Sequence, residues 1–403
     1  MAVIKRVRLS EIAELVTKGT TPTTLGYEFQ DTGVNFLKIE CFSEKGDYIQ
    51  NKATHISEEC HEKLKRSQLK EGDILFSIAG VIGRVAIVTR NMLPANINQA
   101  LAIIRIKKDD IYLPYVKLIL TSPLIKKQFE RKKQGVAQLN ISLKDINDLE
   151  IPLPEIGKQI EYANSFKKVE KLIYTRQYQL QKLDELVKAR FVEMFGDPVG
   201  NTKAYYVATL QELICKGYIT YHSDGNHGGD YPKSDEFVEA GTPYISANCI
   251  VNGEVDFSKA KYLTLERANK LRKGIAQNGD VLFAHNATVG PTVVLHTTKE
   301  KVILGTSLTA YRCNKEKILP SYLKAYMLSD GFIRQYSNEM KQTTRNQVPI
   351  TAQKKYLFLI PPIGLQNQFA TFVNQVDKSK VAVQKSLDEA QLLFDSLMQQ
   401  YFE

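Results

Sequence analysis

The sequence lacks the short motifs that mark the common classes of enzyme. It contains no phosphate-binding P-loop, no GxGxxG turn after a strand, no HExxH zinc motif and no GxSxG nucleophile turn. The [D/N]PP[Y/F] tetrapeptide of enzymes that methylate amino groups is missing as well. These absences argue against nucleotide binding, metal-dependent hydrolysis and methyl transfer, and they favour a chain that is not an enzyme.

Cysteine is scarce and scattered, and long apolar runs are missing. No CxxC pair occurs among the five cysteines Cys41, Cys60, Cys215, Cys249 and Cys313. Such a set indicates free thiols in a reducing compartment, not disulfides or a zinc site. No run approaches the 18 apolar residues of a membrane span, and residues 1–10 contain no signal-peptide core. We therefore expect a cytoplasmic protein without a membrane association.

The chain has an excess of positive charge. Its 403 residues include 54 Lys and Arg against 44 Asp and Glu, for a net charge of +10. A basic protein of this size favours a polyanionic partner, with nucleic acid first, although an ordinary basic surface is the alternative. The length predicts two or three domains.

A long helix without proline or glycine is predicted over residues 158–195. Apolar residues recur along it every seven positions, which predicts a seam for a partner helix: Phe166, Ile173, Leu180, Val187 and Met194. A second such helix is predicted over residues 366–402. Its apolar positions fall in two registers: Val376, Val383, Ala390 and Leu397, and Leu387, Phe394 and Tyr401.

Charged residues interrupt both seams, at Arg176 and Arg190 in the first helix and at Lys380 in the second. Polar seam positions fix the register of a helix pair or face a further partner. The first helix is slightly basic and the second slightly acidic, which favours antiparallel pairing within one chain. A dimerisation coil is the alternative.

The two halves of the chain repeat one another. Residues 71–88 (EGDILFSIAGVIGRVAIV) match residues 278–295 (NGDVLFAHNATVGPTVVL), with Gly72 and Gly279 207 positions apart. The same offset relates PEIGKQ at 154–159 to PPIGLQ at 361–366. One offset across a strand pair, a proline turn and a long helix indicates a duplicated unit.

Each half is predicted to open with a short helix, over residues 9–16 and 209–215. Strands are predicted in matching order in both halves: 35–39, 73–78, 84–88 and 101–106, then 243–247, 280–284, 292–295 and 308–312. The sequence Gly196-Asp197-Pro198 ends the first long helix. The boundaries follow as a first domain, a central helix, a second domain and a C-terminal helix: 1–155, 156–198, 199–364 and 365–403.

Two polar loops are candidates for ligand contact. The second half contains HSDGNHGGDYPKSDEF at 222–237, from which we select Asp224, Asn226, His227, Tyr231 and Lys233. Glycines there let backbone N–H groups approach a phosphate. A metal site formed by His222, Asp224, His227 and Asp230 is an alternative, although the spacing fits no standard zinc site; a solvated loop is another. The counterpart in the first half supplies Lys18, Thr20, Thr21 and Thr23.

Further candidates combine basic and amide side chains, since Lys and Arg neutralise phosphates while Gln and Asn pair with adenine edges. In the first half they are Lys133, Gln134, Gln138 and Asn140, and in the second Lys341, Thr343, Arg345 and Asn346. A solvated helix end is the alternative. The loops after the GD[IV]LF strands add Ser77, Arg84, His285 and Asn286, while Asn98 and Gln99 are weaker candidates.

Taken together, the chain resembles the specificity (S) subunit of type I restriction-modification enzymes over its whole length. The resemblance is carried by the two GD[IV]LF strands, the DGNHGGDYP loop, the PxIGxQ helix entries and the FGDP that ends the first helix. It implies an α+β fold with a pseudo-two-fold internal repeat. In that fold, two globular mixed α/β target-recognition domains are separated by two long antiparallel helices, a coiled coil.

The resemblance also implies a function. Each target-recognition domain would read one half of a split site in double-stranded DNA. The helices would act as a spacer and dock methyltransferase (M) subunits, two of them, while restriction (R) subunits join the same complex. S-adenosylmethionine, ATP and magnesium would be bound by those partners, with no cofactor and no metal in this chain. The first half has GTTPTTLGY where the second has the fuller loop, so the domains would read different sequences.

Two other functions are compatible with parts of the sequence. One is a self-contained DNA methyltransferase or nuclease, which the missing motifs disfavour. The other is a coiled-coil scaffold that joins two protein-binding domains. Binding of S-adenosylmethionine by the chain alone would favour the first, and weak, sequence-independent DNA retention with tight protein partners would favour the second.

Overall fold

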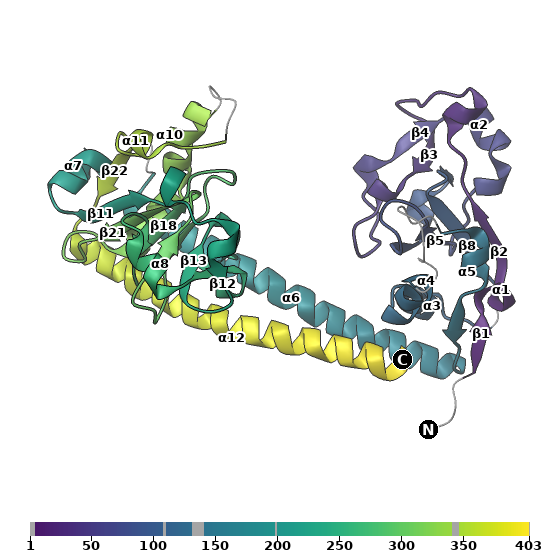
Figure 1. The fold of residues 1–403 in the computed structure, drawn as a ribbon. Helices are drawn as coiled ribbons and strands as arrows, with labels where there is room; N and C mark the ends of the chain where they lie inside the picture. Colours follow the sequence, from purple (N-terminus) through teal and green to yellow (C-terminus); the bar gives the residue numbers. More distant parts are fainter. Residues whose placement is uncertain (1–4, 108–109, 131–140, 198–199, 341–345, 403) are drawn as a thin grey trace. The chain divides into compact units, whose positions relative to one another are not determined.

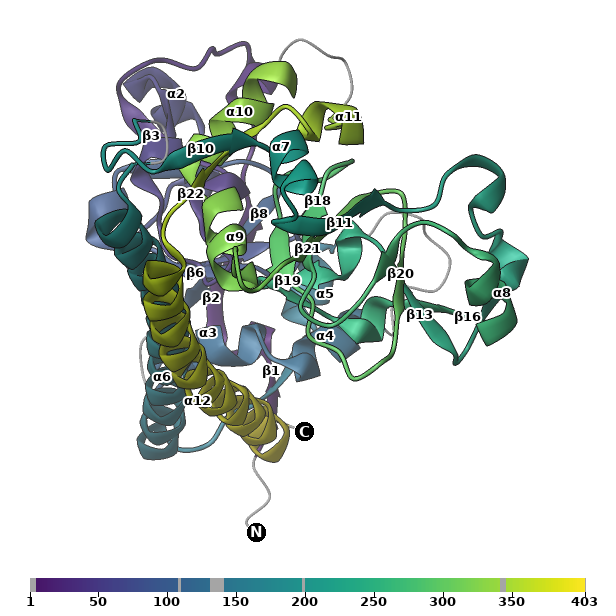
Figure 2. The ribbon, with the colours of Figure 1, turned by 90° about the vertical axis from the view of Figure 1, so that its left-hand side faces the viewer.

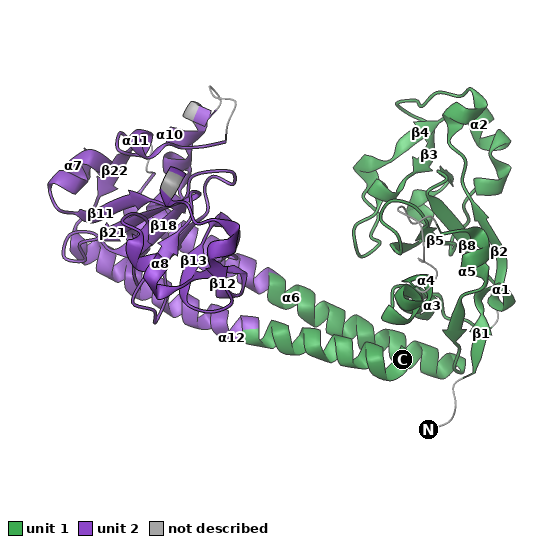
Figure 3. Cartoon of the chain, in the orientation of Figure 1, with its two compact units in different colours: residues 1–177, 385–403 green, residues 178–384 purple. Residues whose placement is uncertain are grey.

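The structure is a computed structural model that describes residues 5–107, 110–130, 141–197, 200–340 and 346–402. The chain forms two compact units: unit 1 holds residues 1–177 and 385–403, and unit 2 holds residues 178–384 (Figure 3). Both divisions fall inside 40-residue helices, α6 (Ile156–Phe195) and α12 (Ile363–Phe402). Each unit therefore combines a globular domain with one half of each long helix.

The main sheet of unit 1 is antiparallel. Its strands lie in the order β2 (Ala13–Lys18), β8 (Leu101–Ile106), β5 (Ile74–Ser77) and β6 (Val85–Ile87). Figure 1 shows the first three of them side by side. Both faces of this sheet are buried, which explains why β5 and β8 read as nearly continuous apolar runs. A second sheet covers one face, in the order β4 (Thr54–Ile56), β3 (Val34–Leu37) and β7 (Ala95–Ile97).

Helices cover the other face of the main sheet in unit 1. The core there includes side chains from α3 (Leu113–Leu120), α4 (Pro123–Glu130), α5 (Leu143–Asn147) and both long helices. The smaller elements are α1 (Leu9–Ile12), α2 (Glu58–Lys63) and the antiparallel pair β1 (Arg6–Arg8) and β9 (Glu150–Pro152). Short 3₁₀ turns complete the unit: η1 (Pro22–Leu25), η2 (Ile39–Cys41), η3 (Gln50–Lys52), η4 (Lys65–Ser67) and η5 (Arg90–Met92).

Unit 2 repeats this plan. Its main sheet has the order β11 (Ile219–Asp224), β21 (Leu308–Cys313), β18 (Val281–Ala284) and β19 (Thr292–Val294). The second sheet has the order β12 (Phe237–Val238), β16 (Lys261–Leu263), β13 (Thr242–Ile245), β20 (Val302–Leu304) and β17 (Ile275–Ala276). Figure 2 shows β13, β16 and β20 beside the main sheet of unit 2.

Most of the remaining elements of unit 2 also have counterparts in unit 1. Its helices are α7 (Leu210–Cys215), α8 (Leu265–Lys270), α9 (Pro320–Met327), α10 (Asp330–Met340) and α11 (Ile350–Gln353). The strand pairs are β10 (Tyr206–Thr209) with β22 (Leu357–Ile360), and β14 (Ile250–Val251) with β15 (Glu254–Val255). Its 3₁₀ turns are η6 (Gly228–Asp230), η7 (Ser234–Glu236), η8 (Ala247–Cys249) and η9 (Phe257–Lys259).

The duplication extends to individual side-chain interactions. In unit 1 Arg105 forms an ion pair of 2.7 Å with the buried Asp73, and in unit 2 Arg312 pairs with the buried Asp280 at 2.8 Å. Both residues of the second pair lie 207 positions after those of the first. A buried carboxylate needs such a partner, so the same requirement has the same solution in both units.

In each unit the halves of α6 and α12 pack antiparallel. In unit 1, near the start of α6 and the end of α12, Tyr162 stacks on Tyr401 with ring centroids 4.1 Å apart. In unit 2, near the end of α6 and the start of α12, Phe195 meets Phe369 edge-on at 5.4 Å. Gly196 follows α6 with a φ of 78° and its N–H donates to the Val192 carbonyl, as expected of a glycine that ends a helix.

The predicted strands are all present, but one predicted helix is wrong in part. The helix expected over residues 9–16 ends at Ile12, and Ala13–Lys18 forms strand β2. Strand β2 pairs along its length with β8, which lies far along the chain. This non-local pairing outweighs the local helical pattern.

All five cysteines are free, as the sequence indicated, and Cys41, Cys60 and Cys249 are buried. Within the described part of the chain, no helix combines the length and the apolar character that a membrane span requires.

Candidate nucleic-acid interface

The first candidate loop of each unit leaves the end of an equivalent strand. In unit 1 the loop follows β2, and the Gly19 N–H donates to the Leu101 carbonyl at 3.4 Å. In unit 2 it follows β11, and the Gly225 N–H donates to the Leu308 carbonyl at 3.0 Å. A Cβ at Gly19 would lie 1.9 Å from the Ile97 carbonyl oxygen, so only glycine fits where this loop crosses the second sheet.

The same crossing occurs in unit 2, where a Cβ at Gly225 would lie 1.9 Å from the Gly305 carbonyl oxygen. Gly19 and Gly225 are therefore equivalent, so Lys18 corresponds to Asp224 and Thr20 corresponds to Asn226. The two loops thus have the same path and different side chains.

The side chains of the unit 1 loop are mostly accessible. Lys18, Thr20 and Thr23 are exposed, and the Thr21 hydroxyl donates to the side-chain oxygen of Gln99. This bond brings Gln99, a weaker candidate from the sequence, next to the loop. The loop therefore presents an ammonium group and hydroxyl groups, both of which can donate to a phosphate or a base edge.

The unit 2 loop carries an acidic and an imidazole group. His227 Nε2 lies 2.8 Å from Asp224 Oδ2, and His227 is exposed. Tyr231 and Lys233 are exposed as well, with 47% of Tyr231 accessible. Asn226 differs, because it is buried and its amide nitrogen donates to the Lys273 carbonyl at 3.0 Å. Asn226 therefore positions the loop and does not face solvent.

The second candidate loops contain mostly internal groups. Ser77 is fully buried and its hydroxyl donates to the Ala79 carbonyl. The Arg84 guanidinium donates to the Ile39 and Phe42 carbonyls at 3.2 and 2.8 Å. Ser77 is thus closed to solvent and Arg84 is half-buried, and each side chain satisfies the backbone of a loop.

In unit 2 the corresponding loop begins at His285, which is 1% exposed. Asn286 is half-buried and forms a β-bridge with Gln347, and the Ala287 N–H donates to the Asn346 carbonyl at 3.1 Å. Asn346 itself is exposed. His285 thus lies inside the unit, contrary to the role expected for it, while Asn346 lies at the surface beside the same loop.

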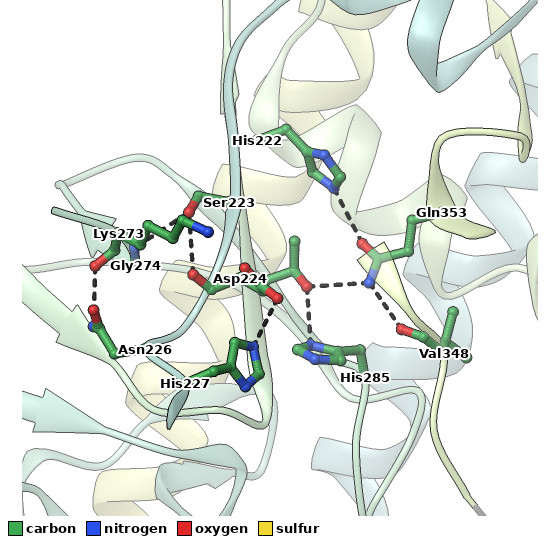
Figure 4. A network of polar contacts seen from close by, with 11 residues as sticks. His222, Ser223, Asp224, Asn226, His227, Lys273, Gly274, His285, Val348 and Gln353 are labelled. Carbon is green, nitrogen blue, oxygen red and sulfur yellow. Dashed lines mark hydrogen bonds and ion pairs between the residues drawn. The ribbon is translucent and has the colours of Figure 1, made fainter. Parts of the chain in front are cut away.

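A buried polar network holds these segments of unit 2 together (Figure 4). At its centre is Gln353, whose side chain is fully buried. The Gln353 amide nitrogen donates to Thr309 Oγ1 at 3.1 Å and to the Val348 carbonyl at 3.2 Å. Its oxygen accepts from the Tyr311 hydroxyl at 2.5 Å and lies 3.1 Å from His222 Nε2. All four polar positions of one amide are used, which fixes its orientation.

The network continues to His285, whose Nδ1 lies 2.9 Å from Thr309 Oγ1. Burial lowers the pKa of His285 to about 4, and burial likewise lowers the pKa of His222 to about 4. Both imidazoles are therefore neutral near pH 7. They act as hydrogen-bonding groups that fix the ends of β11 and β18, not as cations for DNA.

Unit 1 has an apolar core at the same place. The Ile141 N–H donates to the Ile78 carbonyl, and in unit 2 the Val348 N–H donates to the His285 carbonyl, so these positions correspond. The residues 207 positions before those of the network are buried and aliphatic: Ile78, Ala102, Ile104, Ile141 and Ile146. The comparison of the two halves of the sequence did not single out Thr309, Tyr311 or Gln353. Each is polar where the other half has an aliphatic residue, and this difference could have identified them.

The family described as "Type I restriction modification DNA specificity domain" matches residues 3–185 and 222–390, most of the chain. The chain belongs to this family.

Curated relatives carry the same family name in their descriptions. The chain is similar to the type I restriction enzyme EcoBI specificity subunit of Escherichia coli, at 32% identity over 142 residues, or 35% of this chain and 28% of that one. It is also similar to the MjaVIII specificity subunit of Methanocaldococcus jannaschii, at 22% identity over 67% of this chain and 64% of the relative. The matched regions thus span about a quarter and less than two thirds of these relatives.

Solved structures share the fold. One comes from a study of complex assembly and conformational transition of the type I R-M system, with a TM-score of 0.61, 16% identity and coverage of 98% of this chain and 97% of that chain. Another is the S subunit of a type I restriction-modification system from M. genitalium, with a TM-score of 0.54, 14% identity and coverage of 100% and 97%. The specificity-domain fold therefore extends over the whole chain.

The apolar seam of the long helices lies where the two helices of this specificity protein pack. Phe166, Ile173, Val376 and Ala390 are buried. The other seam residues are half-buried: Leu180, Val187, Met194, Val383, Leu387 and Leu397.

The charged seam residues contact the other helix in each case. Arg176 Nε donates to Ser386 Oγ at 3.1 Å, and Lys380 pairs with Asp184 at 2.5 Å. Arg190 lies over the Phe372 ring at 5.7 Å. Between the two alternatives left by the sequence, these contacts favour the fixing of register over a face left open for a partner.

Several candidate residues of the specificity domains fall outside the described residues: Lys133, Gln134, Gln138, Asn140, Lys341, Thr343 and Arg345. Among the residues that are described, no group of three or more His, Cys, Asp or Glu side chains is arranged to hold a metal ion. The candidate interface among the described residues thus consists of the loops after β2 and β11, with Gln99 beside the first and Asn346 beside the loop after β18.

Proposed function

We propose that this chain is a non-catalytic DNA-binding specificity subunit, in which each target-recognition domain reads one half of a bipartite site in double-stranded DNA. One observation carries the proposal: equivalent loops leave the equivalent strands β2 and β11 by the same glycine crossing, yet display unlike side chains. A shared path with different chemistry is what two readers of different half-sites require.

The chemistry of each loop supports unlike half-sites. The unit 1 loop offers Lys18 and Thr20, which donate to acceptor-rich edges such as that of guanine, and to phosphates. The unit 2 loop offers the Asp224 carboxylate, an acceptor, paired with His227, and the exposed Tyr231. The net charge of +10 supplies the salt-dependent attraction that any DNA-binding protein needs.

We further propose that two methyltransferase subunits and the restriction subunits assemble on this chain. S-adenosylmethionine, ATP and magnesium would then be bound by those partners. Large apolar side chains exposed on the long helices support a protein contact there: Leu186, Val192, Val381 and Leu392. Co-expression with a methyltransferase subunit and purification through a tag on this chain tests the assembly.

Selection from a library of random DNA duplexes tests DNA reading. The full-length chain, with its methyltransferase subunits, is expected to enrich two short sequence blocks separated by a gap of constant length. The variant T20A/T21A should alter one block and H227A/Y231A the other, because these residues belong to separate units. Enrichment of no sequence, or of one continuous block, would refute bipartite recognition.

A further inference from the structure

A pair of adjacent basic residues recurs in both units. Lys65 and Arg66 in unit 1 lie 207 positions before Arg272 and Lys273 in unit 2, each pair just ahead of a segment of the second sheet. All four residues are exposed. None of their side chains forms a hydrogen bond or an ion pair with any residue that the structure describes.

Some of the other cations that recur at this offset have an internal role. Lys117 donates to the Lys45 carbonyl at 2.9 Å, and Lys324 donates to the Gly253 carbonyl at 3.3 Å. Arg105 and Arg312 neutralise buried carboxylates. Their repetition is explained by the fold itself, whereas no contact within the described chain accounts for the exposed pairs. The side chains of the exposed pairs are therefore available to a partner outside the chain.

In unit 2 the basic pair is attached directly to the candidate DNA-reading loop. The Lys273 carbonyl accepts from the Asn226 amide at 3.0 Å, and the Gly274 N–H donates to Ser223 Oγ at 3.2 Å (Figure 4). A Cβ at Gly274 would lie 2.9 Å from the Gly225 Cα, so the two segments touch. Arg272 and Lys273 are thus held beside the loop that carries Asp224 and His227.

Unit 1 places its pair in the corresponding position. Lys65 and Arg66 form the first two residues of η4, which lies against β2, the strand that ends at Lys18. The buried Asn96 amide donates to Ser67 Oγ and to the Leu64 carbonyl, both at 3.0 Å. The backbone on both sides of the pair is therefore fixed, while the two charged side chains remain in solvent.

We propose that each basic pair is a phosphate clamp that grips the DNA backbone beside the bases read by the neighbouring loop. The clamp deepens the proposed function and rests on it. The order of the residues is Lys-Arg in unit 1 and Arg-Lys in unit 2, so the shared property is charge and not the planar geometry of arginine. Equal charge beside unlike reading loops is expected of contacts that carry no sequence information.

Neutralising one clamp should change salt dependence without changing specificity. Log affinity falls as log salt concentration rises, with a slope of about −0.9 for each phosphate contact on duplex DNA. We therefore expect R272Q/K273Q to make this slope shallower by about 1.8. K65Q/R66Q should do the same. Affinity should fall by an equal factor on the selected duplex and on a scrambled duplex, and the enriched motif should stay unchanged.

Two matched variants serve as controls. R272K/K273R keeps both charges in the order found in unit 1 and should retain the wild-type slope. K299Q/K315Q removes the same charge from exposed lysines elsewhere in unit 2. Lys315 follows β21, and the turn before Lys299 is held to Asn278, so both lie where β18 begins, at the opposite end of the sheet from the loop. That variant should leave the slope unchanged.

The clamp is refuted if R272Q/K273Q keeps the wild-type slope, if K299Q/K315Q lowers it equally, or if the loss is confined to one DNA sequence. Failure of the proposed function looks different, because the wild-type chain would then enrich no motif in the duplex selection, whatever the slopes of the variants.

Discussion

At the scale of single residues, unit 2 has a buried polar network where unit 1 has aliphatic side chains. Gln353, Thr309 and Tyr311 satisfy one another, and His285 joins them through Thr309. A satisfied buried network favours one arrangement of the surrounding segments, because any other leaves polar groups unpaired. The network therefore fixes the loops after β11 and β18, which we propose to be part of the reading surface.

The buried His285 predicts a dependence of stability on pH. Its folded pKa of about 4 lies below the ordinary value near 6.5, so the unfolded chain binds the proton more readily. The contribution of the neutral His285 to the unfolding free energy is therefore complete above about pH 6.5, and it is lost as the pH falls toward 4. The wild type should therefore lose unfolding free energy between about pH 6.5 and pH 4. We expect this loss to be smaller, by on the order of 2 kcal/mol, in H285I, which has the isoleucine found at the corresponding position of unit 1.

Denaturant unfolding at a series of pH values measures this difference. H296Q, which removes an exposed histidine of the same unit, should behave like the wild type. Equal losses for H285I and the wild type would show that His285 is not neutral in the folded protein.

At the scale of elements, a buried glutamine joins each long helix to its globular domain. Gln159 Oε1 accepts from the Tyr112 N–H at 2.9 Å, and its amide donates to the Pro154 carbonyl at 2.8 Å. In unit 2, Gln366 accepts from the Leu319 N–H and donates to the Pro361 carbonyl, both at 2.9 Å. The glutamine of the PxIGxQ pattern thus satisfies backbone groups at the helix entry and before the next helix.

Replacing either glutamine by leucine should destabilise its own unit. Q366L leaves the Leu319 N–H and the Pro361 carbonyl buried without partners, and we expect a loss of about 2–4 kcal/mol in the unfolding free energy of unit 2. Q159L should do the same in unit 1. Hydrogen exchange should report faster exchange of the Leu319 amide in Q366L. The exposed Gln399 provides the control Q399L. An equal loss of unfolding free energy in Q399L would argue against a stabilising role for the hydrogen bonds of the buried glutamines.

At the scale of the whole molecule, both long helices are continuous across the division between the units. In each unit the helix halves are held in register by aromatic contacts and by a polar contact, Arg176 with Ser386 in unit 1 and Lys380 with Asp184 in unit 2. We propose that this helix pair sets the gap between the two half-sites.

Lengthening both helices tests this proposal. Four residues inserted after Gln177 and four after Gln384 add about 6 Å to each helix. At about 3.4 Å per base pair, the gap in the selected motif should grow by roughly two base pairs. Four residues inserted after Lys299, in a surface loop, should leave the gap unchanged. A constant gap in the lengthened variant would show that the helices do not set it.

Sequence comparison within the chain predicted much of this architecture. The 207-residue offset and the heptad pattern are visible locally, since a strand or helix buries one face at a regular period. They predicted three strands of each main sheet, both long helices and the glycine that ends α6, but not the edge strands β2 and β11. The predicted helix at 9–16 failed beyond Ile12, because the partner of β2 is a strand distant in the sequence.

The sequence by itself determined that two similar domains, with unlike polar loops, are joined to two long helices. The tertiary structure decided which of the candidate residues reach solvent. Ser77, Asn226 and His285 are polar residues in candidate loops like Thr20 and His227, yet they are buried. Asn226 and His285 form their hydrogen bonds with residues farther along the chain, Lys273 and Thr309. Local composition records the polarity of a side chain, but only the folded chain determines whether its partner is the protein or a ligand.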